Sequence, residues 1–162
     1  MKTYLHSLLI VLGLSLALAL PGSVYASPGG GSTIAPASAP VDPDVANANK
    51  AIKEKNWNKA VELLTKAVAR DDKNAEIHNL LGYSERNRGN LDVAFKQYER
   101  ALELDPKHRG AHEYIGEAYL MVGNLPKAEE HLAKLDKLCV FSCEEYRDLK
   151  TAVAEYKRKQ PK

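Results

Sequence analysis

Apolar side chains recur at helical spacing through the middle of the chain. Ile77, Leu80 and Leu81 begin one run, and a second run has apolar residues at positions 91, 94, 95, 98, 101 and 102. This spacing of three and four residues is typical of an amphipathic α-helix that buries one face. Gly89-Asn90 separates the two runs and allows the chain to turn back. The pattern therefore predicts two helices joined as a hairpin.

The same pattern returns at a constant interval along the chain. Ala60, Ala94 and Ala128 stand 34 residues apart, so that residues 41–74, 75–108 and 109–142 align as three units. Small residues at such positions let two helix backbones approach closely, and a larger side chain should cost about 1–3 kcal/mol by overpacking. A repeat of this length predicts a solenoid in which each unit packs mainly against its neighbours.

The phases of the small residues resemble those of the tetratricopeptide repeat. The second unit resembles the family most closely, through Gly82, Gly89, Ala94, Ala101 and Pro106. The first unit departs from it, since Lys55 stands where the family has a turn glycine. The resemblance covers about residues 41–142. It implies an all-α fold, a right-handed α-α superhelix of three helix hairpins. No strand pattern occurs in the sequence.

The pattern of residues 143–158 predicts one more helix, which would cap the end of the stacked hairpins. Its apolar stripe contains Tyr146, Leu149, Val153 and Tyr156. Ser142 followed by Glu145 has the spacing of a capping box at the start of this helix. We expect its outer face to solvate the end of the solenoid. The three repeats would thus occupy residues 43–142, with the capping helix after them.

The first 42 residues divide into two segments that we do not expect to join the fold. Residues 1–26 have Lys2, an apolar run from Leu8 to Leu20, and a Val-Tyr-Ala end, which is the layout of a cleaved signal peptide. Residues 27–42 are rich in Gly, Ser, Pro and Ala, and predict a disordered linker. We therefore predict secretion into the periplasm, without stable membrane insertion after cleavage.

Charge and motifs narrow the possible functions. The 23 basic and 21 acidic residues are nearly balanced, which gives no support for nucleic-acid binding. His108 and His112 are four residues apart, but no third ligand has supporting spacing, so we expect two partly exposed polar residues. No set of residues combines a nucleophile with an acid and a base. We predict no enzyme, no catalytic residue, no metal site and no cofactor.

Cys139 and Cys143 are the two cysteines of the chain, and they flank the turn before the capping helix. An oxidising compartment favours a disulfide between them, which would pin the capping helix to the last repeat. The closed loop is short, so its stabilisation should be about 2 kcal/mol or less. Free or transient thiols, and metal or redox chemistry, are the alternatives. The C-x-x-x-C spacing differs from the C-x-x-C of redox enzymes.

The family resemblance also implies a binding surface. The first helix of each repeat lines a concave groove in this family, and ligand-contacting positions carry over to Asn49, Lys53, Asn79, Tyr83, Arg86, Glu113 and Glu117. One branch of the family grips a C-terminal carboxylate with paired Lys and Arg. This chain has Val45, Leu80, Gly110 and Tyr114 at the corresponding positions, so that role is not expected.

Two functions follow as hypotheses. The first is a non-enzymatic interaction module or scaffold in the cell envelope, which binds a protein or peptide of unknown identity in the groove. The alternative is an accessory to thiol-redox or metal chemistry in the envelope, acting through Cys139 and Cys143. The oligomeric state stays open, because solenoid ends can stack.

Overall fold

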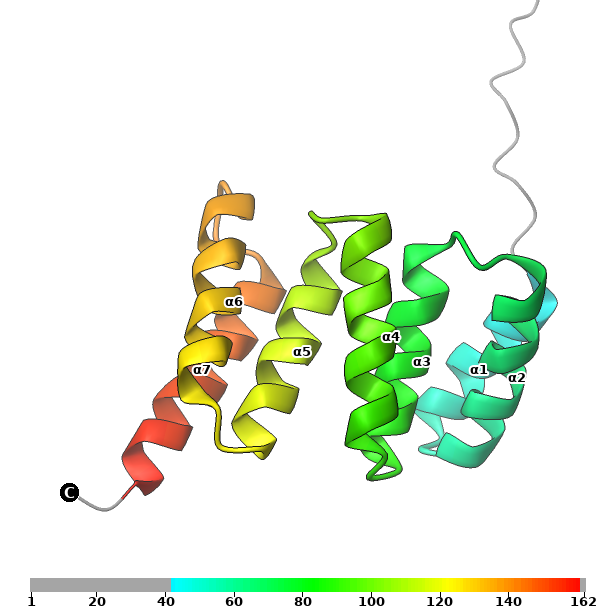
Figure 1. The fold of residues 1–162 in the computed structure, drawn as a ribbon, viewed down its shortest axis with the longest axis horizontal. Coiled ribbons are helices and arrows are strands. Elements are labelled where there is room, and N and C mark those ends of the chain that lie inside the picture. Colours follow the sequence, from blue (N-terminus) through cyan, green and yellow to red (C-terminus); the bar gives the residue numbers. More distant parts are fainter. Residues whose placement is uncertain (1–41, 161–162) are drawn as a thin grey trace, which may run out of the picture. The chain divides into compact units, whose positions relative to one another are not determined.

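The computed structural model describes residues 42–160, which form seven α-helices and no strand (Figure 1). The predicted signal peptide lies outside these residues, as does the predicted linker apart from Asp42. The helices are α1 (Pro43–Lys53), α2 (Trp57–Arg70), α3 (Ala75–Asn87), α4 (Leu91–Leu104), α5 (Arg109–Met121), α6 (Leu125–Leu138) and α7 (Glu144–Lys159).

The helices pair as hairpins. The pairs are α1 with α2, α3 with α4, and α5 with α6, and each pair packs against the next through α2 with α3 and α4 with α5. In Figure 1, α1, α3 and α7 lie behind α2, α4 and α6. The last helix, α7, packs against both α5 and α6. The predicted fold, three helix hairpins followed by a capping helix, is confirmed.

Polar caps and left-handed turn residues set the helix boundaries. Asp42 accepts a hydrogen bond from the backbone N–H of Asp44 at 2.8 Å, and so caps α1. Gly89 and Gly123 end two of the turns with φ of +87° and +78°. Lys55 occupies the equivalent turn of the first hairpin with φ of +56°, although its side chain makes this conformation less favourable than for glycine. The departure seen in the sequence is therefore a change of residue and not of backbone.

Two glycines permit close helix contacts. A Cβ at Gly82 of α3 would lie 2.7 Å from the Tyr98 ring of α4, and a Cβ at Gly116 of α5 would lie 2.6 Å from Leu149 Cδ2 of α7. Tyr98 and Leu149 are both fully buried. The repeat glycines therefore dock α4 on α3 and the capping helix on α5.

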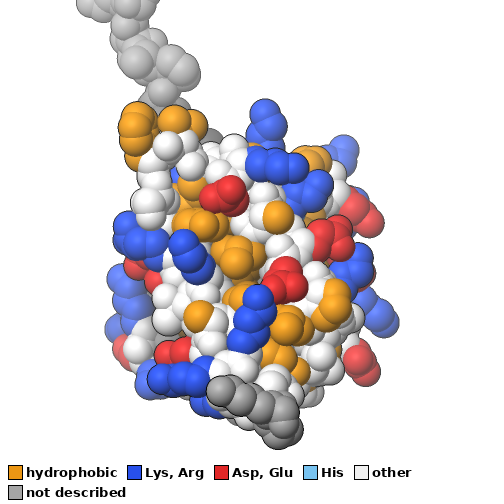
Figure 2. Space-filling model, turned by 90° about the vertical axis from the view of Figure 1, so that its left-hand side faces the viewer, with side chains coloured by type: hydrophobic (Ala, Val, Ile, Leu, Met, Phe, Trp, Pro, Cys, Tyr) orange, Lys and Arg blue, Asp and Glu red, His pale blue; other side chains and the backbone are white. Residues whose placement is uncertain are grey.

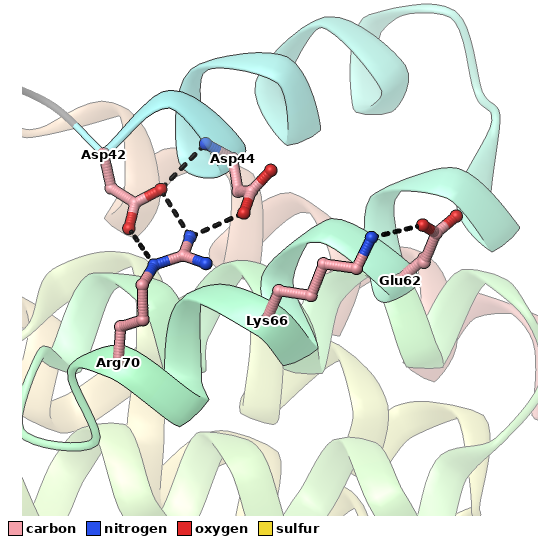
Figure 3. A network of polar contacts seen from close by, with 5 residues as sticks. All are labelled: Asp42, Asp44, Glu62, Lys66 and Arg70. Carbon is pink, nitrogen blue, oxygen red and sulfur yellow. Dashed lines mark hydrogen bonds and ion pairs between the residues drawn. The ribbon is translucent and has the colours of Figure 1, made fainter.

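Charged side chains join the two ends of the first hairpin (Figure 3). Arg70, at the end of α2, donates to both carboxylate oxygens of Asp42 at 2.8 and 2.9 Å and to Asp44 at 2.6 Å. These contacts lower the pKa of Asp42 below its usual value, chiefly through the Arg70 hydrogen bond. On the same helix Lys66 pairs with Glu62. All these groups lie at the surface.

The start of α7 differs from the prediction in its cap. The N-cap residue is Cys143, with no side-chain cap bond, so the predicted Ser142–Glu145 capping box is wrong. Glu145 instead forms an ion pair with Arg109 of α5 at 3.6 Å. The box fails because Cys143 is still extended and the helix begins only at Glu144, so Ser142 lies one residue too early. Cys143 is bonded to Cys139, with their Cα atoms 5.6 Å apart. The predicted disulfide is confirmed, and it joins the end of α6 to the start of α7.

The histidine prediction is wrong for one of its two residues. His108 caps α5 by accepting from the N–H of Ala111, and it is partly exposed as expected. His112 is buried instead, and its Nδ1 lies 2.9 Å from Nδ1 of His131 on α6. The pKa of His131 is lowered to about 4, chiefly by burial and in part by the neighbouring His112. The pair is a packing contact between α5 and α6 that sequence spacing did not suggest.

The exposed end of the stack is formed by α6 and α7. Figure 2 faces this end and shows charged side chains around the apolar ones, as expected of a solvating cap. None of the helices within residues 42–160 is both apolar and long enough to span a bilayer.

Candidate functional site

The residues that the sequence assigned to a groove lie on α1, α3 and α5. We call the surface formed by these helices and α7 the groove face. Asn79, Tyr83 and Arg86 come from α3, whereas Glu113 and Glu117 come from α5. These five surround two neighbouring features, a tyrosine–arginine cluster and an acidic cavity.

Asn49 and Lys53 of α1 lie apart from these features. Asn49 is half-buried and Lys53 is exposed. Within residues 42–160, no hydrogen bond or ion pair connects either side chain to α3 or α5. The structure therefore gathers the α3 and α5 candidates and leaves those of α1 as separate surface positions.

Arg86 is the centre of the tyrosine–arginine cluster, which consists of Tyr83, Arg86, Tyr114 and Glu117. Its guanidinium lies 5.3 Å from the centroid of the Tyr83 ring and 5.4 Å from that of Tyr114, which is cation–π distance. It donates to the Glu117 carboxylate and to the backbone oxygen of Tyr114. The Arg86 side chain is only 11% exposed. The cluster is thus held rigidly between α3 and α5.

The tyrosine rings extend the cluster across the hairpins. Tyr83 lies edge-on to Trp57 of α2, with centroids 5.8 Å apart, and 4.8 Å from the Tyr114 ring. Burial raises the pKa of Tyr114 to about 12, so its hydroxyl stays protonated at neutral pH. Burial also raises the pKa of Tyr98, behind the cluster, whose hydroxyl finds no hydrogen-bond partner among residues 42–160.

An acidic cavity of about 350 Å³ lies between α3, α5 and α7. Its lining consists of Glu76, Asn79, His108, Gly110, Glu113, Tyr114, Glu144, Glu145 and Asp148. Two of these carboxylates have partners: Glu76 bonds His108 at 3.0 Å, and Glu145 pairs with Arg109. The hydrogen bond that His108 donates to Glu76 is the main reason that the pKa of His108 is raised.

Glu113 is the most unusual residue of the acidic cavity. It is only 8% exposed, yet its carboxyl group has no hydrogen bond or ion pair in the described part of the chain. Its pKa is raised to about 8, chiefly by burial and in part by the nearby carboxylates of Glu117, Asp148 and Glu145. Arg86 opposes the rise. Burial and neighbouring negative charges both disfavour the ionised form of a carboxyl group, so Glu113 is mostly protonated at neutral pH.

A second depression of about 450 Å³ adjoins the cluster toward the ends of α3 and α5. Arg86 and Glu117 form one part of its lining, and the rest is supplied by Asn87, Leu120, Met121 and Ala152. Met121 is an exposed apolar side chain. The groove face therefore offers an acidic cavity on one side of the cluster and a partly apolar depression on the other.

Sequence reasoning missed the contribution of α7. It assigned this helix a capping role alone, whereas Glu144, Glu145 and Asp148 line the acidic cavity. Their acidic character and their place in the first turns of α7 were visible in the sequence. Only the docking of α7 on α5 shows that they face Glu113.

The described residues offer no evident metal site. Within residues 42–160, no three His, Cys, Asp or Glu side chains are grouped as metal ligands would be. Both cysteines are engaged in the disulfide.

Comparison with known proteins identifies the architecture. A family model described as the tetratricopeptide repeat matches residues 45–107 and 84–139. The chain belongs to the tetratricopeptide repeat family. A curated human relative, protein O-mannosyl-transferase TMTC3, is 28% identical over 75 residues, which are 46% of this tetratricopeptide chain. The match spans only 8% of the human protein.

Solved tetratricopeptide structures share the fold at low identity. The Yersinia enterocolitica type III secretion translocator chaperone SycD has a TM-score of 0.65 at 18% identity, over 72% of this chain and 82% of that one. The TPR2B domain of yeast Sti1, in a complex with pHsp70, has a TM-score of 0.66 at 16% identity and covers 72% and 95%. The second TPR domain of human RPAP3, solved with the HSP70 peptide SGPTIEEVD, has a TM-score of 0.63 at 22% identity and covers 72% and 93%.

Proposed function

We propose that this protein is a non-enzymatic interaction module that binds an extended segment of a partner protein across its groove face. The segment would cross the tyrosine–arginine cluster and reach the acidic cavity beside it. The partner's identity is not specified by the fold.

The observation that carries this proposal is the preorganisation of the cluster. Arg86 is fixed by two aromatic rings and by Glu117, so little side-chain entropy would be lost when a ligand contacts it. Tyrosine and arginine are the residues that most often dominate binding energy at protein interfaces. Tyr83 and Tyr114 are half-buried, and each combines an apolar ring with a hydroxyl that can hydrogen-bond a backbone.

The related structures support binding as the class of function. The yeast Sti1 and human RPAP3 domains are described in complex with HSP70 or its peptide. The RPAP3 peptide ends in the acidic sequence EEVD. The groove face here is acidic around Glu113 and has Val45, Leu80, Gly110 and Tyr114 at the clamp positions, so we expect a partner of different charge.

The proposed setting is the cell envelope. The signal-like residues 1–26 and the Cys139–Cys143 disulfide favour an oxidising compartment such as the periplasm. Fractionation of the native host, with the protein followed by an antibody, tests this setting. Full-length protein recovered from the cytoplasm would contradict it.

Photo-crosslinking tests the groove. A photoreactive amino acid at the exposed position Asn87 should capture partner protein in an envelope extract. Tyr83→Ala combined with Arg86→Ala should abolish the captured species, because it removes the centre of the cluster. Lys96→Ala, on exposed α4, is the control and should leave capture unchanged. Unchanged capture in the double variant would contradict the proposal.

The thiol alternative has a separate test. Titration of the folded protein with a thiol reagent should find no reactive thiol if the disulfide is purely structural. Two rapidly reacting thiols under periplasmic conditions would favour redox or metal chemistry through Cys139 and Cys143.

A further inference from the structure

The acidic cavity contains a buried amide oxygen without a partner and a largely buried carboxyl group that forms no ion pair. Glu113 has no hydrogen bond or ion pair, and Asn79 is 3% exposed with no hydrogen-bond partner for its Oδ1, both judged within residues 42–160. Buried polar groups in native proteins are nearly always satisfied, so an exception indicates an atom that pairs with water, an ion or a ligand. The side chains of Asn79 and Glu113 line the same cavity.

Carboxyl groups predominate around this cavity, since five of its nine lining residues are Asp or Glu. Glu144 and Asp148 of α7 line the cavity, and neither has an ion pair among the described residues. Arg86 and Arg109 of the groove face are already paired with Glu117 and Glu145. A ligand that supplied several N–H donors and a positive charge would satisfy the cavity, whereas a carboxylate would be repelled.

An organic cation fits the cavity better than a bare metal ion. The described acidic side chains are not grouped as metal ligands. The cavity volume of about 350 Å³ is also far larger than a dehydrated ion needs. Tyr114, which lines the cavity and also belongs to the tyrosine–arginine cluster, offers a ring surface for the methylene groups of a long side chain.

We propose that the acidic cavity binds a lysine or arginine side chain of the partner segment, with Glu113 as its principal ion-pair partner. This inference rests on the proposed function, because the same segment would cross the tyrosine–arginine cluster. Asn79 would accept a second hydrogen bond, while Asp148 and Glu144 supply negative potential from α7. The partner is therefore a basic segment.

Short peptide libraries provide the probe for this cavity. Each library has one fixed central residue, Lys, Arg, Gln or Glu, between uncharged degenerate flanks. Fluorescence polarisation should show the Lys and Arg libraries binding wild-type protein at least about tenfold more tightly than the Gln library, and the Glu library most weakly. Glu113→Gln should remove the preference. Glu99→Gln, an equal charge change on exposed α4, should retain it.

Proton release gives a second measurement that a structural role would not produce. Glu113 is mostly protonated at pH 7, and a bound cation would favour its ionised form. Calorimetry of the Lys library in buffers of different ionisation enthalpy should therefore show release of roughly one proton per complex at pH 7. The release should disappear in Glu113→Gln. Thermal unfolding should show that this isosteric variant still folds.

The outcomes separate this inference from the proposed function. If the libraries bind equally, or if Glu113→Gln keeps the Lys and Arg preference, the cationic site is wrong while groove binding stands. If no library binds but crosslinking at Asn87 still depends on Arg86, the same conclusion follows. If Ca²⁺ alone binds wild-type protein, displaces the Lys library and fails to bind Glu113→Gln, the occupant is a metal ion and the proposal is overturned.

Discussion

Two acidic groups of this protein have opposite environments. At the start of α1, Asp42 and Asp44 both contact Arg70, and their pairing lies at the surface (Figure 3). Between α5 and α7, Glu113 is buried and forms no ion pair within residues 42–160. Arg70 lowers the pKa of Asp42, whereas burial raises that of Glu113. The carboxylates at the start of α1 are paired within the protein, whereas Glu113 would gain an ion-pair partner only from a bound cation.

This difference indicates that the carboxylates at the start of α1 and those around Glu113 have different roles. A satisfied surface network can join two helix ends without involving any ligand. A buried, unpaired carboxyl group opposes folding when it is ionised, and such groups are typical of binding and catalytic sites. A bound cation would offset this unfavourable free energy. We therefore place the ligand contact at Glu113 and not at the first hairpin.

The largest effect should come from separating α7 from α5. Leu149 is fully buried against Gly116, so Leu149→Ala should lower the free energy of unfolding by about 3–4 kcal/mol. Urea unfolding measures the loss. Hydrogen exchange should accelerate in α5 and α7 and change little in α1 and α2, because repeats couple mainly to their neighbours.

The exposed residue Glu155 of α7 supplies the control for this variant. Glu155→Ala should leave both the unfolding curve and hydrogen exchange nearly unchanged. Uniform acceleration of exchange across all helices in Leu149→Ala would contradict the expected local effect.

The second effect is a pH-dependent gain of stability in Glu113→Gln. Folding raises the pKa of Glu113 from 4.5 to about 8. Between these two pH values, the native state therefore keeps a proton that the unfolded state has lost. Wild-type stability should therefore fall as pH rises from 4.5 through 8, by on the order of 2–3 kcal/mol for this group. Glutamine stays neutral, so the variant should be the more stable protein at pH 8 and nearly equal to wild type at pH 4.5.

Denaturant unfolding across this pH range measures the Glu113 effect. Asp42→Asn gives the opposite comparison, because the lowered Asp42 pKa contributes stability above its unfolded value that is lost as pH falls. A Glu113→Gln variant that is less stable than wild type at pH 8 would show that the carboxylate has a cationic partner after all.

A smaller effect should follow from removal of the disulfide. Cys139→Ala with Cys143→Ala opens a loop of only a few residues, so we expect a loss of about 2 kcal/mol or less. The packing of Leu149 should keep α7 docked, and the Lys-library preference should persist. Thermal unfolding with and without reductant measures the loss, and reductant should not affect the double variant. A lost library preference would show that the disulfide itself shapes the acidic cavity.

The smallest effect should come from Arg70→Ala. This substitution removes an exposed ion pair whose strength is screened by water and salt. Its change in melting temperature should be the least of the four and should shrink further in high salt. Peptide binding should be unaffected, because Arg70 lies at the end of α2 and belongs neither to the tyrosine–arginine cluster nor to the acidic cavity. Weakened library binding in this variant would connect the two regions that we treat as independent.

Several elements could be predicted from the sequence because they depend on local pattern. The period of Ala60, Ala94 and Ala128 indicates the helix hairpins, and the apolar stripe within residues 143–158 indicates the capping helix. The Cys139–Cys143 pairing followed from a short turn and the expected compartment. Each of these depends on residues near one another in sequence, or on a repeat that averages over many positions.

The candidate site was only partly predictable. Family positions identified Asn79, Tyr83, Arg86, Glu113 and Glu117, which the structure brings together around the tyrosine–arginine cluster and the acidic cavity. Sequence analysis did not reveal that Arg86 is enclosed by Tyr83 and Tyr114. The predicted Ser142–Glu145 capping box is wrong because the helix begins one residue later, after the extended Cys143, and Glu145 pairs with Arg109.

The sequence by itself determined that this protein is a stack of helix hairpins, because amphipathic periodicity and small residues at a fixed interval allow few other ways to bury an apolar stripe. The tertiary structure alone decided which charges face one another. Glu113 and Asp148 are far apart along the chain, and their proximity depends on how α7 docks against Gly116. Whether a carboxyl group is a solvated surface charge or a buried binding group depends on such neighbours, since burial and nearby charges set its pKa.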